Sequence, residues 1–341
     1  MDSLWTIQHR KTINKRIKDA RNRSKPIKCP LCNKQLGKTC NSHSIPQMIL
    51  KTIETNGHFY NKNKVDNMMF FDSEVGMNST GTFHYICNSC DGTFFSDYEC
   101  PEAIHSVPNN KILIEIAAKN FLLKMQQKSY ERAFFKYDTV LQCTDMINDR
   151  EEAIRVAELD FRDYSECLDN LVKDKEENTA RFKIIYRTIL PYVTPIAAQE
   201  CFTIYKDRLG NKINDPYVGE EDKIQVVHLC IFPYDGQTTV LMFYDVTDTS
   251  YDALYEQFLN STEDENLRYI NYYMLAFAEN YFYSEKINKI ILQDNSLKKI
   301  SQEYIGERGN FGVTTLGARS AIYTPVKYNE IPFLLGKEFA L

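Results

Sequence analysis

The sequence lacks an apolar run long enough for a membrane-spanning helix, which needs roughly 18 consecutive residues. Glycine and proline are sparse, with 13 and 11 among 341 residues, whereas 43% of the residues are hydrophobic. Disordered and low-complexity chains show the opposite balance. The first residues also lack the apolar segment of a secretory signal peptide. We therefore expect a folded cytoplasmic protein with no membrane partner, long enough for two or three domains of roughly 100–200 residues each.

Several motifs of nucleotide and ester chemistry are missing as well. The chain contains no Gly-rich phosphate loop, no Walker lysine and no Gly-x-Ser-x-Gly elbow. The sequence therefore gives no signal for a P-loop NTPase or an α/β-hydrolase.

Cysteine, by contrast, is plentiful. Of ten cysteines, four form two Cys-x-x-Cys pairs, Cys29 with Cys32 and Cys87 with Cys90. In a cytosolic protein, singly scattered cysteines are usually small buried hydrophobes, so we expect no disulfide framework from the rest. The scattered cysteines are Cys40, Cys100, Cys143, Cys167, Cys201 and Cys230.

The two pairs predict a zinc site. Four thiolates close a tetrahedral Zn²⁺ site with no open position, which makes the metal structural. The pairs are separated by 54 residues, so the metal would tie together distant parts of a small domain. The alternative is four unrelated buried cysteines, which the turn-like polar sequence around both pairs disfavours.

The charge is unevenly distributed. Residues 1–28 carry nine Lys and Arg against two Asp, a net charge of +7, while the remaining residues carry 32 basic and 44 acidic groups, a net charge of −12. A basic arm beside a zinc module is what a phosphate backbone attracts, so DNA is the partner expected for residues 1–100. The alternative is an ordinary solvated basic helix.

The N-terminal third shows a strand-and-helix pattern around the cysteines. Residues 3–23 predict a short amphipathic helix, and residues 39–45 predict a strand that carries His43. Pro46 opens a helix after that strand. A strand over 83–87 leads into the second pair, and a helix over 91–99 follows, with Asp91 as a plausible N-cap.

The remainder changes from helical to alternating periodicity. Residues 110–130 and 132–178 predict helices, the second with about three heptads that favour an intramolecular hairpin and leave a dimer seam open. Alternation begins at residue 180, and residues 224–232 and 238–245 predict a β-hairpin. A helix over 251–285 and a strand over 314–323 complete the pattern, with a further possible strand at 68–71.

These elements predict an α+β protein: an N-terminal treble-clef or ββα-metal zinc module, a helical middle, and a mainly antiparallel C-terminal sheet with flanking helices. The expected segments are a basic arm at 1–26, the zinc module at 27–105, a helical connector at 106–179, and a regulatory or partner-binding domain at 180–341.

One stretch resembles a known family. Cys29-x-x-Cys32, then Ser42-His43-Ser44-Ile45-Pro46, then Cys87-x-x-Cys90 leading into a helix, resembles the HNH (ββα-metal) endonuclease superfamily, especially members with a four-cysteine zinc site. The match covers residues 27–100. Proteins of this make-up often belong to restriction and phage-defence systems, which is an analogy at the level of fold.

The resemblance assigns roles to two residues. His43 would be the general base that activates water for attack on a phosphodiester, as the near-neutral pKa of imidazole permits. Asp91 would be a ligand of a catalytic Mg²⁺ or Mn²⁺ ion that stabilises the scissile phosphate. Ser42 departs from the family, which has a carboxylate at that position, and no Asn or His clearly follows Asp91 in the helix. Glu99 and His84 are therefore further candidates.

His43 keeps three interpretations at this point: a catalytic base, a relic in a purely binding module, or a structural residue near the zinc. The expected function is metal-dependent hydrolysis of DNA phosphodiesters, with a non-catalytic zinc module that binds nucleic acid or protein as the alternative. A protein partner or a homodimer is expected through residues 140–178 or the C-terminal domain. His228, inside a strand, is expected to be a core histidine.

Overall fold

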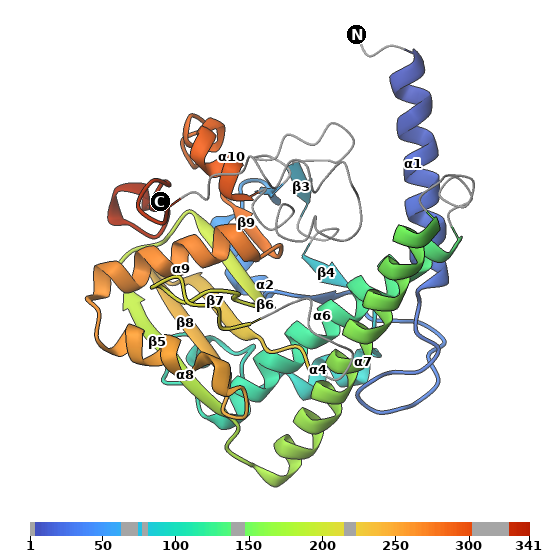
Figure 1. Cartoon of the computed structure of the whole chain (residues 1–341), viewed down its shortest axis with the longest axis horizontal. Coiled ribbons are helices and arrows are strands. Elements are labelled where there is room, and N and C mark those ends of the chain that lie inside the picture. The colour runs from blue at the N-terminus through green and yellow to red at the C-terminus, as the bar shows by residue number, and fades with distance from the viewer. Residues whose placement is uncertain (1–3, 63–73, 77–80, 138–146, 215–222, 302–326) are drawn as a thin grey trace.

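A seven-stranded antiparallel sheet is the centre of the molecule, with strand order β3-β2-β9-β6-β7-β8-β5 (Figure 1). The computed structural model describes residues 4–62, 74–76, 81–137, 147–214, 223–301 and 327–341. The strands of this sheet are β2 (His58–Asn61), β3 (Glu74–Gly76), β5 (Phe182–Leu190), β6 (Ile196–Phe202), β7 (Val227–Tyr234), β8 (Gln237–Asp245) and β9 (Tyr281–Tyr283). The predicted α+β class is confirmed.

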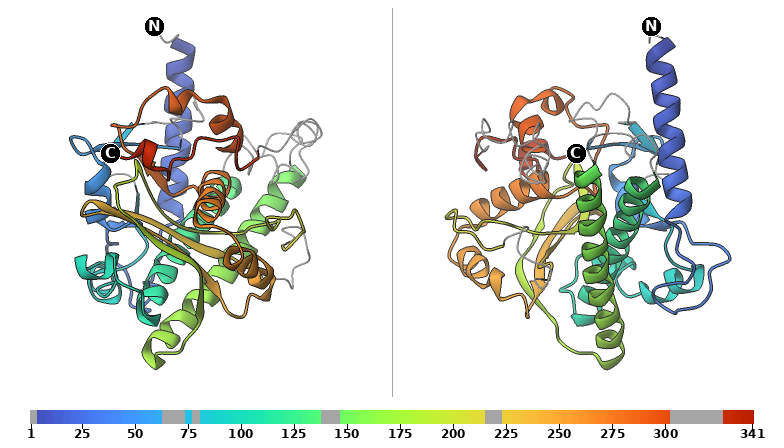
Figure 2. Two further views of the ribbon diagram at one scale, coloured as in Figure 1. Left: turned by 90° about the vertical axis from the view of Figure 1, so that its left-hand side faces the viewer. Right: turned by 45° about the vertical axis from the view of Figure 1, so that its right-hand side comes forward.

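Helices cover both faces of this sheet, so the molecule has three layers (Figure 2). On one side lie α8 (Asp252–Leu259), α9 (Glu263–Phe277) and α10 (Asn295–Ser301). On the other lie α2 (Gln47–Ile53), α4 (Asn88–Phe94), α5 (Pro101–Ile104), α6 (Asn110–Tyr137) and α7 (Ile147–Glu177). The basic helix α1 (Leu4–Arg23) packs on α6 and extends beyond the rest of the chain. Short 3₁₀ turns occupy Thr249–Tyr251, Ile291–Gln293 and Lys337–Phe339.

The three layers explain why the central strands are apolar on both faces. Successive side chains of a strand point to opposite sides of the sheet. On β7, Leu229 and Ile231 pack in the core under α8 and α9, whereas Cys230 and Phe232 pack in the core beneath α6. Because both faces are covered, strands β6 to β8 are buried almost throughout.

The predicted hairpin over β7 and β8 is confirmed. Asp235 and Gly236 alone connect the strands, with φ values of 46° and 78°. Positive φ at both central residues is the signature of a type I′ turn, whose twist matches that of the flanking strands, and Asp-Gly is a favoured sequence for it.

The stretch between the two cysteine pairs contributes to the same sheet. Strand β2 pairs antiparallel with β9, with Tyr60 opposite Tyr283, and β3 pairs with the other edge of β2. The zinc module and residues 180–341 therefore share one sheet. The segment boundaries expected at 105 and 179 stay predictions, and the possible strands at 68–71 and 314–323 lie outside the described residues.

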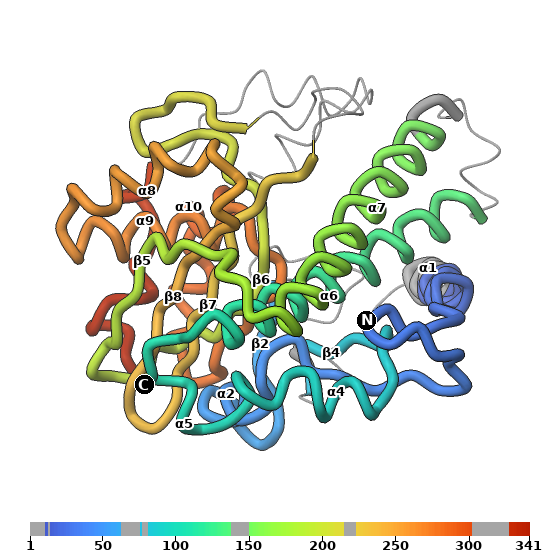
Figure 3. Tube along the Cα trace, turned by 90° about the horizontal axis from the view of Figure 1, so that it is seen from below, coloured from blue at the N-terminus to red at the C-terminus, as the bar shows by residue number. Residues whose placement is uncertain are grey.

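The predicted helical hairpin is confirmed in α6 and α7, which lie side by side (Figure 3). The heptad positions of α7 supply its buried face, with Tyr164, Leu168 and Leu171 in the core beneath the sheet. Packing within one chain accounts for this apolar stripe, as expected for an intramolecular hairpin.

Several predicted elements differ from the structure. The helix expected over 110–130 continues to Tyr137, the helix expected from 132 is described from Ile147, and the strand expected over 39–45 is reduced to Ser42–His43. The single helix expected over 251–285 is divided into α8 and α9, of which the second ends at Phe277, and Tyr281–Tyr283 form strand β9 instead. Pairing with β6 and β2 on both sides decides this, because it buries Phe282 on one face of the sheet and its two tyrosine neighbours on the other. The strand expected over 83–87 is reduced to β4 (Thr82–Phe83).

His228 is a core residue, as expected, and it predicts acid sensitivity. Its ring stacks on Phe243 with 4.8 Å between centroids, and its Nδ1 lies 3.1 Å from the Asn120 amide nitrogen. Burial lowers the pKa of His228 to about 3. In the unfolded chain the imidazole of His228 binds a proton with a pKa near 6.5, whereas in the folded protein it stays neutral down to about pH 3. The free energy of unfolding should therefore fall by about 1.4 kcal/mol per pH unit below pH 6.5.

Urea unfolding at pH 6.5 and pH 5 checks this expectation. A His228→Gln variant should lose about 2 kcal/mol less than the wild type over that interval, because its side chain does not titrate. Equal losses in the two proteins would contradict the assignment.

Candidate metal centre

The four paired cysteines meet at one point, as predicted. The Sγ atoms of Cys29, Cys32, Cys87 and Cys90 all lie within 4.8 Å of one another, and Cys32 Sγ is 3.8 Å from Cys87 Sγ. A tetrahedral ion with Zn–S bonds of about 2.3 Å places its sulfur ligands about 3.8 Å apart. All four are free thiols, so the donor set and spacing fit zinc.

A tight turn brings the first pair together. The N–H of Cys29 donates to Lys34 O at 2.9 Å, and the N–H of Asn33 donates to Cys29 O at 2.8 Å. Asn33 has a φ of 57°, a left-handed conformation that asparagine tolerates better than most residues. The turn therefore reverses the chain directly after Cys32.

The second pair begins helix α4. Cys87 is the N-cap, and its Sγ accepts a hydrogen bond from the Cys90 N–H at 3.4 Å. The expectation that Asp91 caps a helix over 91–99 is wrong: α4 begins at Asn88 because the thiol of Cys87 takes the capping role, and Asp91 lies inside the helix.

The protein environment shifts the pKa values of these thiols in different directions. Burial raises the pKa of Cys29 and of Cys90. Burial acts in the same direction on Cys87, but hydrogen bonds from the Cys90 N–H and the neighbouring thiols outweigh it and lower the pKa of Cys87 to about 7. A helix N-terminus favours a thiolate in this way.

The Asp91 carboxylate connects α4 to the strand that carries His43. It accepts hydrogen bonds from Ser42 Oγ and, at 3.2 Å, from Cys40 Sγ. Its Oδ1 is 4.0 Å from Lys119 Nζ. Burial and the contact with Asp91 raise the pKa of Cys40 to about 12, which keeps that thiol a donor.

His43 and Ser42 form strand β1, which pairs antiparallel with β4, His43 lying opposite Thr82. Ser42 is buried and His43 is half-buried. β1 and β4 thus form a separate two-stranded antiparallel sheet, although α2, β2 and β3 lie between them in the chain, and α4 follows β4. Ser42 is the side chain of β1 that contacts Asp91.

Two neighbours of Asp91, Cys40 and Lys119, were not predicted from the sequence. Lys119 is buried on α6, pairs with Glu99, and lies over the ring of Phe95 at 4.3 Å. The one signal in the sequence was a lysine inside the apolar stretch 113–125. Among the described residues, the four cysteines are the one group of three or more His, Cys, Asp or Glu gathered closely enough for a metal ion.

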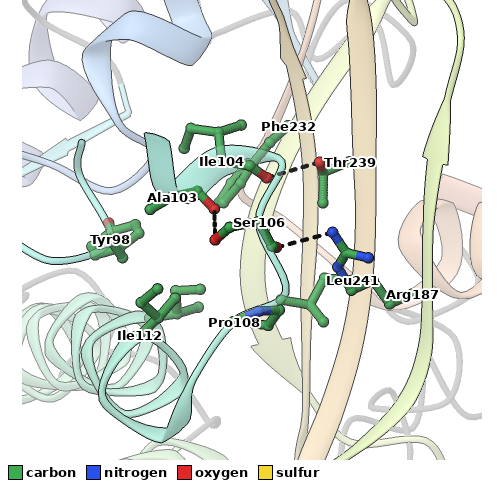
Figure 4. A pocket seen from close by; sticks show the side chains of 11 residues that line it. Tyr98, Ala103, Ile104, Ser106, Pro108, Ile112, Arg187, Phe232, Thr239 and Leu241 are labelled. Atoms are coloured by element: carbon green, nitrogen blue, oxygen red, sulfur yellow. Dashed lines mark hydrogen bonds between the residues drawn. The ribbon is translucent and has the colours of Figure 1, made fainter. Parts of the chain in front are cut away.

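A small cavity lies where α5 meets the sheet (Figure 4). Its volume is about 20 Å³, and apolar side chains including Ile112, Phe232 and Leu241 line it. Arg187 Nη2 donates to Ser106 O at 2.9 Å across its rim. A space that holds about one water molecule is too small for a substrate, so we interpret this cavity as a small gap in side-chain packing.

Comparison of the chain with protein-family models, with curated proteins and with solved structures gave no match. In the part of the chain that the structure describes, every helix is too short or too polar to cross a bilayer.

Proposed function

We propose that residues 27–105 form an HNH-like module that hydrolyses phosphodiester bonds in DNA. One observation carries the proposal: β1 and β4 pair as two antiparallel strands, α4 follows β4 in the chain, and the Asp91 carboxylate on α4 contacts Ser42, the neighbour of His43. The four cysteines support it, because a bound zinc ion would fix the start of α4 relative to the first turn.

In this proposal His43 is the general base that takes a proton from the attacking water. Asp91 is the carboxylate that holds Mg²⁺ or Mn²⁺. A divalent cation bound there would supply charge stabilisation at the scissile phosphate and the leaving oxygen. The zinc ion at Cys29, Cys32, Cys87 and Cys90 is structural and takes no part in the chemistry.

Plasmid nicking in Mg²⁺ or Mn²⁺ tests the proposal. Removing a general base costs roughly 10²–10⁴-fold in rate, so His43→Ala should nick at least about 100-fold more slowly than the wild type. The matched control is His58→Ala, an exposed histidine at the start of β2, which should nick at the wild-type rate. Equal nicking by wild type and His43→Ala, or no nicking by either, would rule out the catalytic assignment.

A second candidate is a non-catalytic zinc module that binds nucleic acid. It is favoured by the contacts of Asp91, whose oxygens already accept from Ser42 and Cys40 and face the Lys119 ammonium. A carboxylate that has hydrogen-bond donors and a nearby ammonium can hold α4 against β1 and α6 without any catalytic ion. Tight DNA binding by a wild-type protein that never cleaves would favour this candidate.

The acidic remainder of the chain suits a different partner. Residues 106–341 carry 27 basic and 36 acidic groups, and their net charge of −9 opposes contact with a phosphate backbone, so we propose that residues 140–178 or 180–341 bind a protein or a second copy of the chain. The nine described cysteines are free thiols, which fits our proposal of a reducing cytoplasmic location.

A further inference from the structure

We propose that a basic hollow between α1 and the zinc module seats the phosphodiester backbone of duplex DNA. The inference rests on the proposed function for the identity of its ligand. The hollow has a volume of about 340 Å³ and is lined by nine described residues, none of which is Asp or Glu. Lys18, Arg21 and Lys25 supply its positive charge.

These cations come from one side of the hollow. Lys18 and Arg21 are three residues apart on α1 and therefore share a helical face, and Lys25 follows the end of the helix at Arg23. All three are exposed. The buried lysines of α6 differ, because Lys124 and Lys128 are each paired with carboxylates. The cations of the hollow are available to a ligand from solvent.

The opposite wall belongs to the zinc module and to α6. The backbone N–H of His84 donates to Gln126 Oε1 at 3.0 Å, and Tyr85 Oη is 2.9 Å from Ser129 Oγ. These bonds fix the chain between β4 and the second cysteine pair against α6.

Helix α1 is held to the same support. The Arg23 guanidinium lies 4.5 Å from the centre of the Tyr137 ring near the end of α6. Both walls are therefore anchored on one long helix, so the hollow is preformed rather than assembled by the ligand.

The hollow adjoins the candidate centre along the chain on two sides. Thr39, in its wall, precedes Cys40, whose thiol donates to Asp91. His84, also in its wall, follows β4, in which Thr82 pairs with His43. A backbone phosphate seated among Lys18, Arg21 and Lys25 would hold the neighbouring part of the same strand at the zinc module. The hollow is thus a positioning site, separate from the chemistry.

The test measures binding rather than cleavage. The full-length protein is titrated into a short fluorescein-labelled DNA duplex without added divalent cation, at salt concentrations between about 50 and 200 mM. The hollow variant carries Lys18→Ala, Arg21→Ala and Lys25→Ala. The control variant carries Lys286→Ala, Lys289→Ala and Lys299→Ala, three exposed lysines whose loss changes the net charge equally.

Each lost phosphate contact lowers the slope of log K against log salt by about 0.9. We expect the hollow variant to lose about 2 to 3 from this slope and to bind at least about tenfold more weakly, while the control stays within about twofold of the wild type. Equal weakening of both variants, wild-type binding by the hollow variant, or no binding by the wild type would overturn the inference. Weakened binding of an RNA duplex alone would overturn DNA as the ligand.

Nuclease activity is scored separately with His43→Ala. If the wild type fails to nick DNA but the hollow variant loses affinity, the hollow stands and the catalytic proposal falls. If the wild type nicks and the hollow variant binds normally, the reverse holds.

Discussion

Replacing Cys87 by serine should release the zinc ion and abolish the ordered structure of residues 27–100. The wild type should contain one zinc ion per chain. Zinc binding contributes about 10–16 kcal/mol to the folding of small zinc fingers, as much as the whole stability of a typical domain, about 5–15 kcal/mol. Serine can still cap α4, so the loss would report the metal ligand and not the cap. Metal analysis and hydrogen exchange measure the two effects.

The control for this prediction is Cys100→Ser. The Cys100 thiol donates to Asp97 O at 3.2 Å and lies outside the four-cysteine group. A serine hydroxyl can make the same bond, so this variant should keep its zinc and its exchange protection. If Cys87→Ser also kept both, the four-cysteine site would be wrong.

The sequence was enough to predict this site because its spacing is local. In each Cys-x-x-Cys pair a single turn brings two thiols together, and the turn is encoded by residues inside or beside the pair, such as Asn33. Only the meeting of the two pairs is non-local. The chemistry of four thiolates predicts that meeting without any knowledge of the fold.

The surroundings of Asp91 could not be predicted in the same way. Its partners Ser42, Cys40 and Lys119 come from β1, the loop before β1, and α6. No periodicity links these positions. Lys119 was hidden for a further reason: a lysine in an apolar helix indicates a buried ion pair, but the pattern does not say which carboxylate completes it.

Long-range strand pairing also explains why one segment of the structure differs from the element predicted for it. The aromatic residues before Glu285 fit a helix by local propensity. The segment Tyr281–Tyr283 is nevertheless a strand, because β2 and β6 pair with it from both sides. β2 lies between the cysteine pairs, more than 200 residues earlier in the chain. The hairpin of β7 and β8 was recognisable because its two strands are neighbours in sequence, and β5 was recognisable by its alternation alone, although β6 and β7 lie between it and its partner β8 in the chain.

Replacing Glu200 by alanine should destabilise the protein by about 3–5 kcal/mol, the cost of leaving one member of a buried ion pair alone. Glu200 on β6 pairs with Lys124 on α6, and both side chains are nine-tenths buried or more. Burial opposes the charge of Lys124, but attraction to Glu200 outweighs it and raises the pKa of Lys124. Without Glu200, the Lys124 ammonium would either remain charged and unpaired in the interior or lose its proton, and both outcomes cost free energy. Urea unfolding measures the loss.

The double variant Glu200→Ala, Lys124→Met separates this cost from the packing. It should be more stable than Glu200→Ala alone, because the unpaired charge is gone. A loss below about 1 kcal/mol in Glu200→Ala would contradict the burial of the pair.

Recovery in the double variant should stay incomplete, since Glu200 also accepts from the backbone N–H groups of Glu279 and Asn280. The Asn280 side chain in turn lies 3.0 Å from Ser44 Oγ, one residue beyond His43. The same carboxylate therefore fixes the loop before β9 that supports the His43 segment. A nuclease centre placed there would depend on the C-terminal sheet as well as on zinc, and Glu200→Ala should loosen residues 42–44 in hydrogen exchange while the zinc content stays at one per chain.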